Sequence, residues 1–127
     1  MLYAILCYNS EEVVSAWTKE EDDAVIARLI AVQDKVAAQG RLGPVVRLQG
    51  TRAATTLRKG PNKSAPIVID GPFAETKEQF LGFYLVECAH LDEAVAFANE
   101  LAEANRGPGG YEIRPVAAFF PSGGKPS

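Results

Sequence analysis

The sequence predicts an α+β fold in which two helices cover one face of an antiparallel sheet. Three observations support this prediction: two segments space their apolar residues as helices do, β-prone segments precede, separate and follow them, and no linker or internal repeat divides the chain. The predicted order is strand, helix, one or more strands, strand, helix, strand. This order is the split βαβ arrangement of a ferredoxin-like sandwich.

The first strand and the first helix have clear local signals. Residues 2–8, LYAILCY, are β-prone and apolar at successive positions, so we predict a strand that is buried on both faces. After a polar bend, residues 18–40 predict a helix that begins with a capping box of Thr18 and Glu21 and ends at Gly40. Trp17, directly before this helix, is expected to be an anchor in the core or in an interface.

The rest of the chain alternates β-prone segments with one more helix. Residues 45–50 and 52–60 predict extended chain, and the later elements are a short strand PIVID, a central strand FLGFYLVECA and a helix over residues 91–107. His90 stands at the N-cap of that helix. The last strand, YEIRPVAAFF, is interrupted at Pro115, which predicts an edge position because proline cannot donate a ladder hydrogen bond.

Length and charge limit the classes of protein to consider. The 127 residues suit one domain over residues 1–120, followed by a flexible tail over residues 121–127. The net charge is −3 and no basic block occurs, so we expect no nucleic-acid binding. The apolar start is too short for a membrane span and lacks the features of a signal peptide, so we expect a cytoplasmic protein without membrane contact.

The metal-ligating and thiol residues are few. Cys7 and Cys88 fall inside predicted strands and should lie far apart as free, buried thiols. His90 is the single histidine, so a zinc site of soft ligands cannot be assembled. A carboxylate site for a hard cation stays open, but we assign no metal and no cofactor.

The strands are apolar on more faces than the two helices can cover. Strand 80–88 carries large apolar side chains on both faces, and strand 2–8 does the same. One face therefore has no cover within a single chain, and large exposed apolar patches usually mark interfaces. We expect a homodimer through this open sheet face, with a cleft enclosed between sheet and loops and room for a small-molecule ligand.

The segment DGPFAETKEQ, residues 70–79, carries more charge than a turn needs. Gly71 and Pro72 supply the turn. Asp70 and Glu75 could act as general bases if burial raised their pKa, and Lys77 could hold a carboxylate ionised or bind an anionic substrate. The alternative is a solvated hairpin, because charged residues normally lie at the surface.

The longer segment DGPFAETKEQFLGFYLVE resembles the signature of the DGPF group of YCII-related proteins. Further matching segments, in the same order as in the family, are LYAILCY, SAWTKEE, ATTLR, HLDEAVAFA and YEIRPV, so the resemblance spans residues 2–116. It implies a ferredoxin-like fold that dimerises through its sheet, as dimeric α+β barrel proteins do. Carried over residue by residue, it places the signature residues Asp70 to Phe73 and Glu75 to Glu78 in the site, with Arg58 from the matching TTLR.

The resemblance implies several possible activities. The wider superfamily includes small-molecule isomerases, lyases, cofactor-free monooxygenases and non-catalytic binding modules. Some relatives use a histidine and aspartate pair in the cleft, whereas His90 of this chain stands at a helix start. The first hypothesis is therefore a cofactor-free enzyme for a small aromatic or carbonyl-containing metabolite.

In this hypothesis Asp70, Glu75 and Lys77 are catalytic, and the ligand-binding residues are Arg58, Glu78 and Tyr84. A second hypothesis is a non-catalytic module that binds a small ligand or a partner protein. A third is that the signature charges form a structural clamp for the hairpin and the dimer.

Overall fold

The computed structural model of the chain describes residues 1–105 and 107–122. Its helices and strands are, in order, β1 (Leu2–Asn9), α1 (Glu11–Ser15), α2 (Lys19–Ala38), β2 (Leu42–Arg47), β3 (Thr55–Arg58), β4 (Ile67–Asp70), β5 (Gln79–Glu87), α3 (Leu91–Ala104) and β6 (Gly110–Pro115). Most of the predicted tail, residues 123–127, lies outside the described part.

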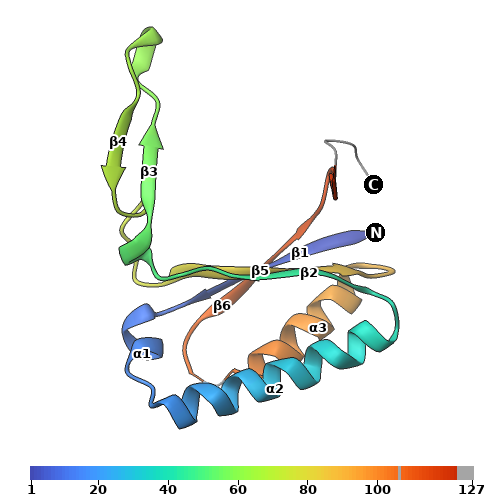
Figure 1. Cartoon of the computed structure of the whole chain (residues 1–127). Helices are drawn as coiled ribbons and strands as arrows, with labels where there is room; N and C mark the ends of the chain where they lie inside the picture. Colours follow the sequence, from blue (N-terminus) through green and yellow to red (C-terminus); the bar gives the residue numbers. More distant parts are fainter. Residues whose placement is uncertain (106, 123–127) are drawn as a thin grey trace.

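Four strands form the main sheet in the order β2-β5-β1-β6, and every neighbouring pair is antiparallel. Helices α2 and α3 lie side by side on one face of this sheet (Figure 1). The prediction of a ferredoxin-like α+β fold is therefore confirmed. Strand β6 is at an edge, where Pro115 does not interrupt a ladder on its outer side.

The core lies between the sheet and the two helices. Ile5 of β1, Val86 of β5 and Leu101 of α3 are fully buried there. Phe97 of α3 meets the ring of Tyr84 edge to face, with 5.7 Å between the ring centroids. Successive side chains of a strand point to opposite faces, so the residues between these core positions point to the other side of the sheet. Helices α2 and α3 do not cover that side (Figure 1).

The local helix signals are only partly confirmed. The capping box is present, since Thr18 Oγ1 accepts from the Glu21 amide and the Glu21 carboxylate accepts from the Thr18 amide, both at 3.1 Å. Helix α1 was not predicted, because the sequence there indicated only a polar bend. It forms because Ser10 Oγ accepts a hydrogen bond from the amide of Val13 at its first turn.

Strands β3 and β4 do not join the main sheet. They form a separate two-stranded sheet that stands out from the body on the side away from the helices (Figure 1). We call residues 51–73, which carry this sheet, the arm. The residues that follow β6 rise on the same side of the main sheet. The sequence predicted extended segments here but not their separation from the main sheet.

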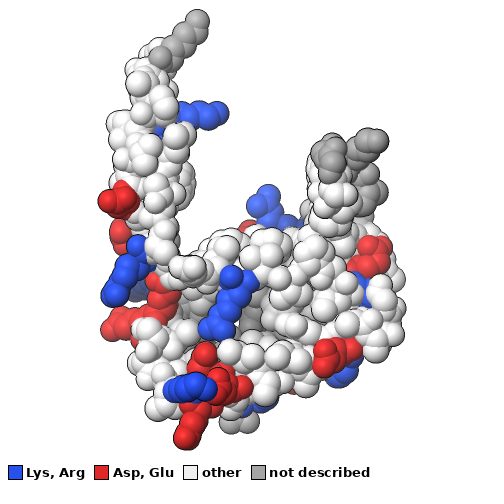
Figure 2. All heavy atoms as spheres, viewed as in Figure 1, with Lys and Arg blue, Asp and Glu red and all other residues white. Residues whose placement is uncertain are grey.

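Much of the arm is apolar and uncovered. Its large exposed apolar side chains are Leu57, Ile67, Val68, Ile69 and Phe73. Most of its surface is uncharged in Figure 2, apart from a basic side chain that projects from its upper part and the acidic and basic side chains near its base. A two-stranded hairpin is marginally stable in water by itself, and large exposed apolar patches usually mark interfaces.

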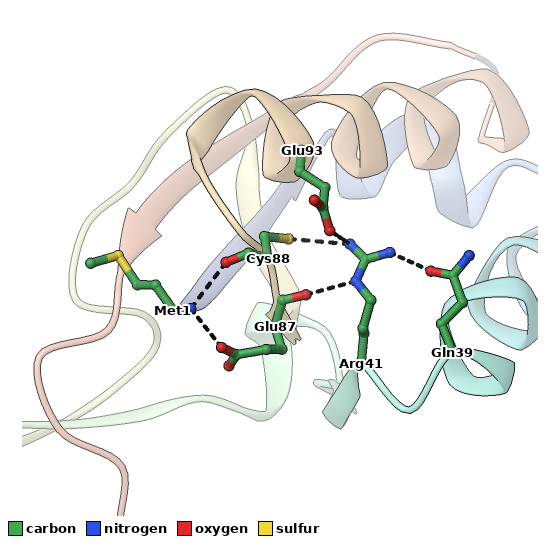
Figure 3. A network of polar contacts seen from close by, with 6 residues as sticks. All are labelled: Met1, Gln39, Arg41, Glu87, Cys88 and Glu93. Atoms are coloured by element: carbon green, nitrogen blue, oxygen red, sulfur yellow. Dashed lines mark hydrogen bonds and ion pairs between the residues drawn. The ribbon is translucent and has the colours of Figure 1, made fainter.

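A polar network joins the chain start to the far end of β5 (Figure 3). The ammonium group of Met1 donates to the Glu87 carboxylate and to the Cys88 carbonyl. Arg41 donates to the Glu87 carbonyl at 2.8 Å, approaches the Cys88 sulfur at 3.5 Å and pairs with Glu93. Cys88 is thus at this end of the sheet, whereas Cys7 pairs with Gly82 near the other end, and both thiols are free as predicted.

Candidate functional site

A cavity of about 200 Å³ lies between α2 and the main sheet. Its lining includes Cys7 and Tyr8, between which the β1–β5 pairing shifts register. Its apolar lining residues come from α1, α2, β2, β5 and the turn between the two helices, and they include Val14, Trp17, Val25, Ile26, Leu29, Ile30, Val45 and Leu81. A concave, mostly apolar space with a few polar groups is the usual form of a small-molecule site.

Gly82 makes the close approach of β2 and β5 possible at this wall. A Cβ atom on Gly82 would lie 2.2 Å from the carbonyl oxygen of Val46, well inside van der Waals contact. Any side chain here would push the two strands apart. The glycine therefore shapes the cavity directly.

Uncharged polar side chains gather in the same cavity. They are Cys7, Tyr8 and Asn9 from β1, Gln33 from α2, Tyr84 from β5, Asn105 from the end of α3 and Tyr111 from β6. Tyr84 is only 8% exposed although it carries a hydroxyl group. Polar groups buried this far from water need partners, so their arrangement constrains what can bind beside them.

Burial raises the pKa values of the thiol and phenol groups in this cluster. Burial raises the pKa of the Cys7 thiol from 9.0 to about 12. Burial also raises the pKa of Tyr111 to about 12, with a further increase from nearby Cys7 and a decrease from the Asn105 side chain beside its hydroxyl. The pKa of Tyr84 is raised by burial and by Cys7, against the opposing effects of Gln33 and Arg47. All three groups are therefore neutral at physiological pH.

The charged lining residues are Asp22 and Arg47, which face each other with 3.5 Å between Oδ1 and Nη2. The side chain of Asp22 is 34% exposed and that of Arg47 is 64% exposed, so the pair is in contact with solvent. Because opposite charges offset each other there, the cavity presents no net charge to a ligand.

One buried polar atom in the cavity wall lacks a partner. Within the described part of the chain, no group donates to Asn105 Oδ1, although solvent does not reach this atom. Unpaired buried acceptors are uncommon in folded proteins and often have a functional reason.

The structure places the predicted site residues in two separate regions. Asp70, Glu75, Lys77 and Glu78 are all exposed, at the end of β4 and in the loop that leads to β5. Tyr84 instead lines the cavity on the helix face. Of the six predicted residues, Tyr84 alone is among the residues that line this cavity.

Arg58 does reach the signature loop. Its guanidinium group lies over the ring of Phe73, 4.6 Å from the centroid, and Nη2 donates to the Phe73 carbonyl at 3.3 Å. Thr56 Oγ1 donates to the Gly71 carbonyl at 2.8 Å, and the Gly71 amide donates to Ala54 at 2.8 Å. In the single chain these contacts fix the turn at the base of the arm.

Sequence reasoning missed Gln33, Asn105 and Tyr111 and treated Cys7 only as a buried thiol. These residues come from separate segments whose individual patterns are those of ordinary helices and strands. The sequence signal nearest to them is the break after α3, which places Asn105 at a helix end.

Comparisons with known proteins place nearly the whole chain in one group. The YCII-related domain matches residues 1–120. An uncharacterized protein of Rhizobium meliloti (strain 1021) is 59% identical over 121 residues, which cover 95% of this chain and 96% of that protein. No helix in the described residues is long and apolar enough to cross a membrane.

Proposed function

This chain belongs to the YCII-related family, and we propose that it binds a small, uncharged molecule in the cavity between α2 and the main sheet. The observation that carries the proposal is the composition of the cavity: apolar walls, with neutral side chains of buried Tyr84 and half-buried Cys7 and Tyr111. Such a space favours an apolar ligand with few polar atoms.

The absence of net charge in the lining supports an uncharged ligand. Moving a charged group into a dry cavity costs several kcal/mol or more unless an opposite charge meets it. Asp22 and Arg47 already face each other and lie toward solvent. A neutral aromatic or aliphatic molecule avoids this cost.

Catalysis by Asp70, Glu75 and Lys77 stays a prediction. A carboxylate becomes an effective general base at neutral pH when burial or neighbours favour its protonated form. These three side chains are exposed in the single chain, so an acid–base site would require cover from a second chain. Ligand binding needs no such cover, and for this reason we favour it over catalysis.

We also propose that the protein is a homodimer through the open sheet face. Leu6 of β1 and Phe83 of β5 lie opposite each other on this face, next to Ala4 and Leu85. The arm, with its exposed apolar side chains, rises on the same side (Figure 1). A second copy placed there would cover both surfaces at once, which is the support for this arrangement.

The binding proposal can be tested with toluene as a neutral probe. The chain has one tryptophan, and Trp17 lines the cavity, so its indole peak in proton–nitrogen correlation spectra reports occupancy. Toluene should shift this peak saturably. Val45→Phe, which fills the cavity wall, should weaken binding by roughly tenfold or more, because the space that the ligand needs is occupied.

Val95→Phe is the matched control. Val95 lies on α3 outside the cavity lining and is 46% exposed, close to the 38% of Val45. This variant should bind toluene as the wild type does. If toluene leaves the Trp17 peak unmoved at all concentrations, or if Val45→Phe binds as tightly as Val95→Phe, the cavity is not the binding site.

A further inference from the structure

We infer that the ligand of this cavity carries a hydrogen-bond donor, a hydroxyl or neutral N–H on an otherwise apolar body, and presents it to Asn105 Oδ1. The inference rests on the proposed function and adds the polar group that the ligand must have. It comes from the unpartnered buried acceptor in the cavity wall.

Asn105 is held in place by its backbone. It is the C-cap residue of α3, and its amide donates to the Leu101 carbonyl at 3.0 Å. Its side chain lines both the main cavity and a neighbouring hollow of about 80 Å³ next to Gly109. The helix end therefore fixes the backbone from which the Asn105 side chain extends.

The surroundings of Asn105 leave its oxygen available. Its side chain lies beside the hydroxyl of Tyr111 and lowers the pKa of that hydroxyl, as a donating amide group does. If the amide nitrogen donates to the Tyr111 hydroxyl, the amide oxygen is left to accept from another donor. Within the described residues no protein group donates to it.

A buried acceptor without a partner costs free energy in the empty protein, and a ligand that donates to it recovers that cost on binding. This gain is selective, because a ligand of equal shape without the donor leaves the oxygen unpaired. A hydroxyl group also accepts, so it can receive a hydrogen bond from the neighbouring Tyr111. A charged ammonium donor is disfavoured, since the lining carboxylate of Asp22 already faces Arg47.

The experiment compares phenol, anisole and toluene in the full-length protein. The three share an aromatic ring, but phenol alone can donate a hydrogen bond. The dissociation constant of each is measured from the Trp17 indole peak in the wild type and in Asn105→Leu, which removes the acceptor at similar volume. The ratio of phenol affinity to toluene affinity is compared between the two proteins. The hydration of the free probes is the same in both cases, so it cancels from this comparison.

Asn99→Leu makes the same change on an exposed part of α3, where the Asn99 side chain donates to Glu103 outside the cavity. It is the matched control. Asn105→Ala is a second variant, and thermal melting checks that each protein is folded. Because anisole cannot donate a hydrogen bond, comparing phenol with anisole in the wild type tests the role of the donor without any substitution.

The expected result is that Asn105→Leu lowers the phenol-to-toluene ratio by roughly three- to tenfold, the effect of one hydrogen bond, while Asn99→Leu leaves it unchanged. If all three probes bind and the ratio stays the same in Asn105→Leu and Asn105→Ala, the inference is overturned while the proposed function stands. If no probe binds to the wild type, the proposed function and the inference both fail.

Discussion

The carboxylate of Glu11 holds Thr51 with two hydrogen bonds: one from the Thr51 amide at 2.7 Å and one from its hydroxyl at 2.6 Å. The Glu11 amide donates in turn to Gln79 Oε1 at 2.9 Å. Helix α1 is thereby tied to the base of the arm and to the start of β5. The same helix leads to Trp17 in the cavity wall, so the arm and the cavity share a support.

Glu11→Ala should destabilise the protein by about 2 kcal/mol, because two donors of partly buried Thr51 lose a charged acceptor. The free energy of unfolding from urea titration measures this loss. Hydrogen exchange of the Thr51 amide should become faster in the same variant. Glu12→Ala, on the exposed side of α1, should change neither quantity. Equal effects of the two variants would show that the Glu11 contacts do not hold the arm.

Leu85→Glu should convert a dimer into a monomer, because it places a charge on the open sheet face next to Phe83. Sedimentation velocity measures the mass of the particle. Leu91→Glu, at a 52% exposed position on α3, adds the same charge on the helix side and should leave the mass unchanged. A wild-type protein that sediments as a monomer at all concentrations would contradict the dimer proposal.

Asp70→Ala and Lys77→Ala should leave toluene binding in the cavity unchanged, since neither residue is part of its lining. Under the structural-clamp hypothesis, Glu75→Gln and Lys77→Met should instead lower the melting temperature or dissociate the dimer. Titration of the Trp17 peak and sedimentation distinguish these effects. Loss of toluene binding in both alanine variants would mean that the binding site lies at the signature residues and not in the cavity. If both leave binding and any detected turnover unchanged, the catalytic hypothesis for these residues fails.

The stability of the protein should fall in alkaline solution, in part because of Cys7. The folded chain keeps the thiol proton up to about pH 12, whereas the unfolded chain loses it near the ordinary value of 9.0. The unfolded state therefore binds fewer protons between these two values, and the stability present below pH 9.0 is lost as the pH rises toward about 12. Tyr111 acts in the same direction, starting from 10.0.

Urea unfolding at a series of pH values measures this effect. Cys7→Ala should show a shallower decline above pH 9.0 than the wild type. Cys88→Ala retains Cys7 and should follow the wild-type curve more closely. Identical slopes for Cys7→Ala and the wild type would mean that the thiol does not titrate with folding.

The order of elements could be predicted because each has a local cause. The capping box of Thr18 and Glu21 starts α2, and the run of apolar residues in β5 marks a strand that is apolar on both faces. Helix α1 was missed since five residues give too little periodicity to recognise. The separation of the arm was missed for a different reason: β-prone residues indicate a strand but do not say which sheet it joins.

The sequence by itself determined the fold class, the family and the free state of both cysteines, because these depend on periodicity, on caps and on an ordered set of motifs. It also predicted that Tyr84 binds a ligand, which stays a prediction. Only the tertiary structure decided that Tyr84 shares a cavity with Cys7, Asn105 and Tyr111, whereas Arg58 lies on the arm. The physical reason is that the cavity polar side chains come from strands and helix ends far apart in the chain, which meet only when α2 and α3 close over the sheet.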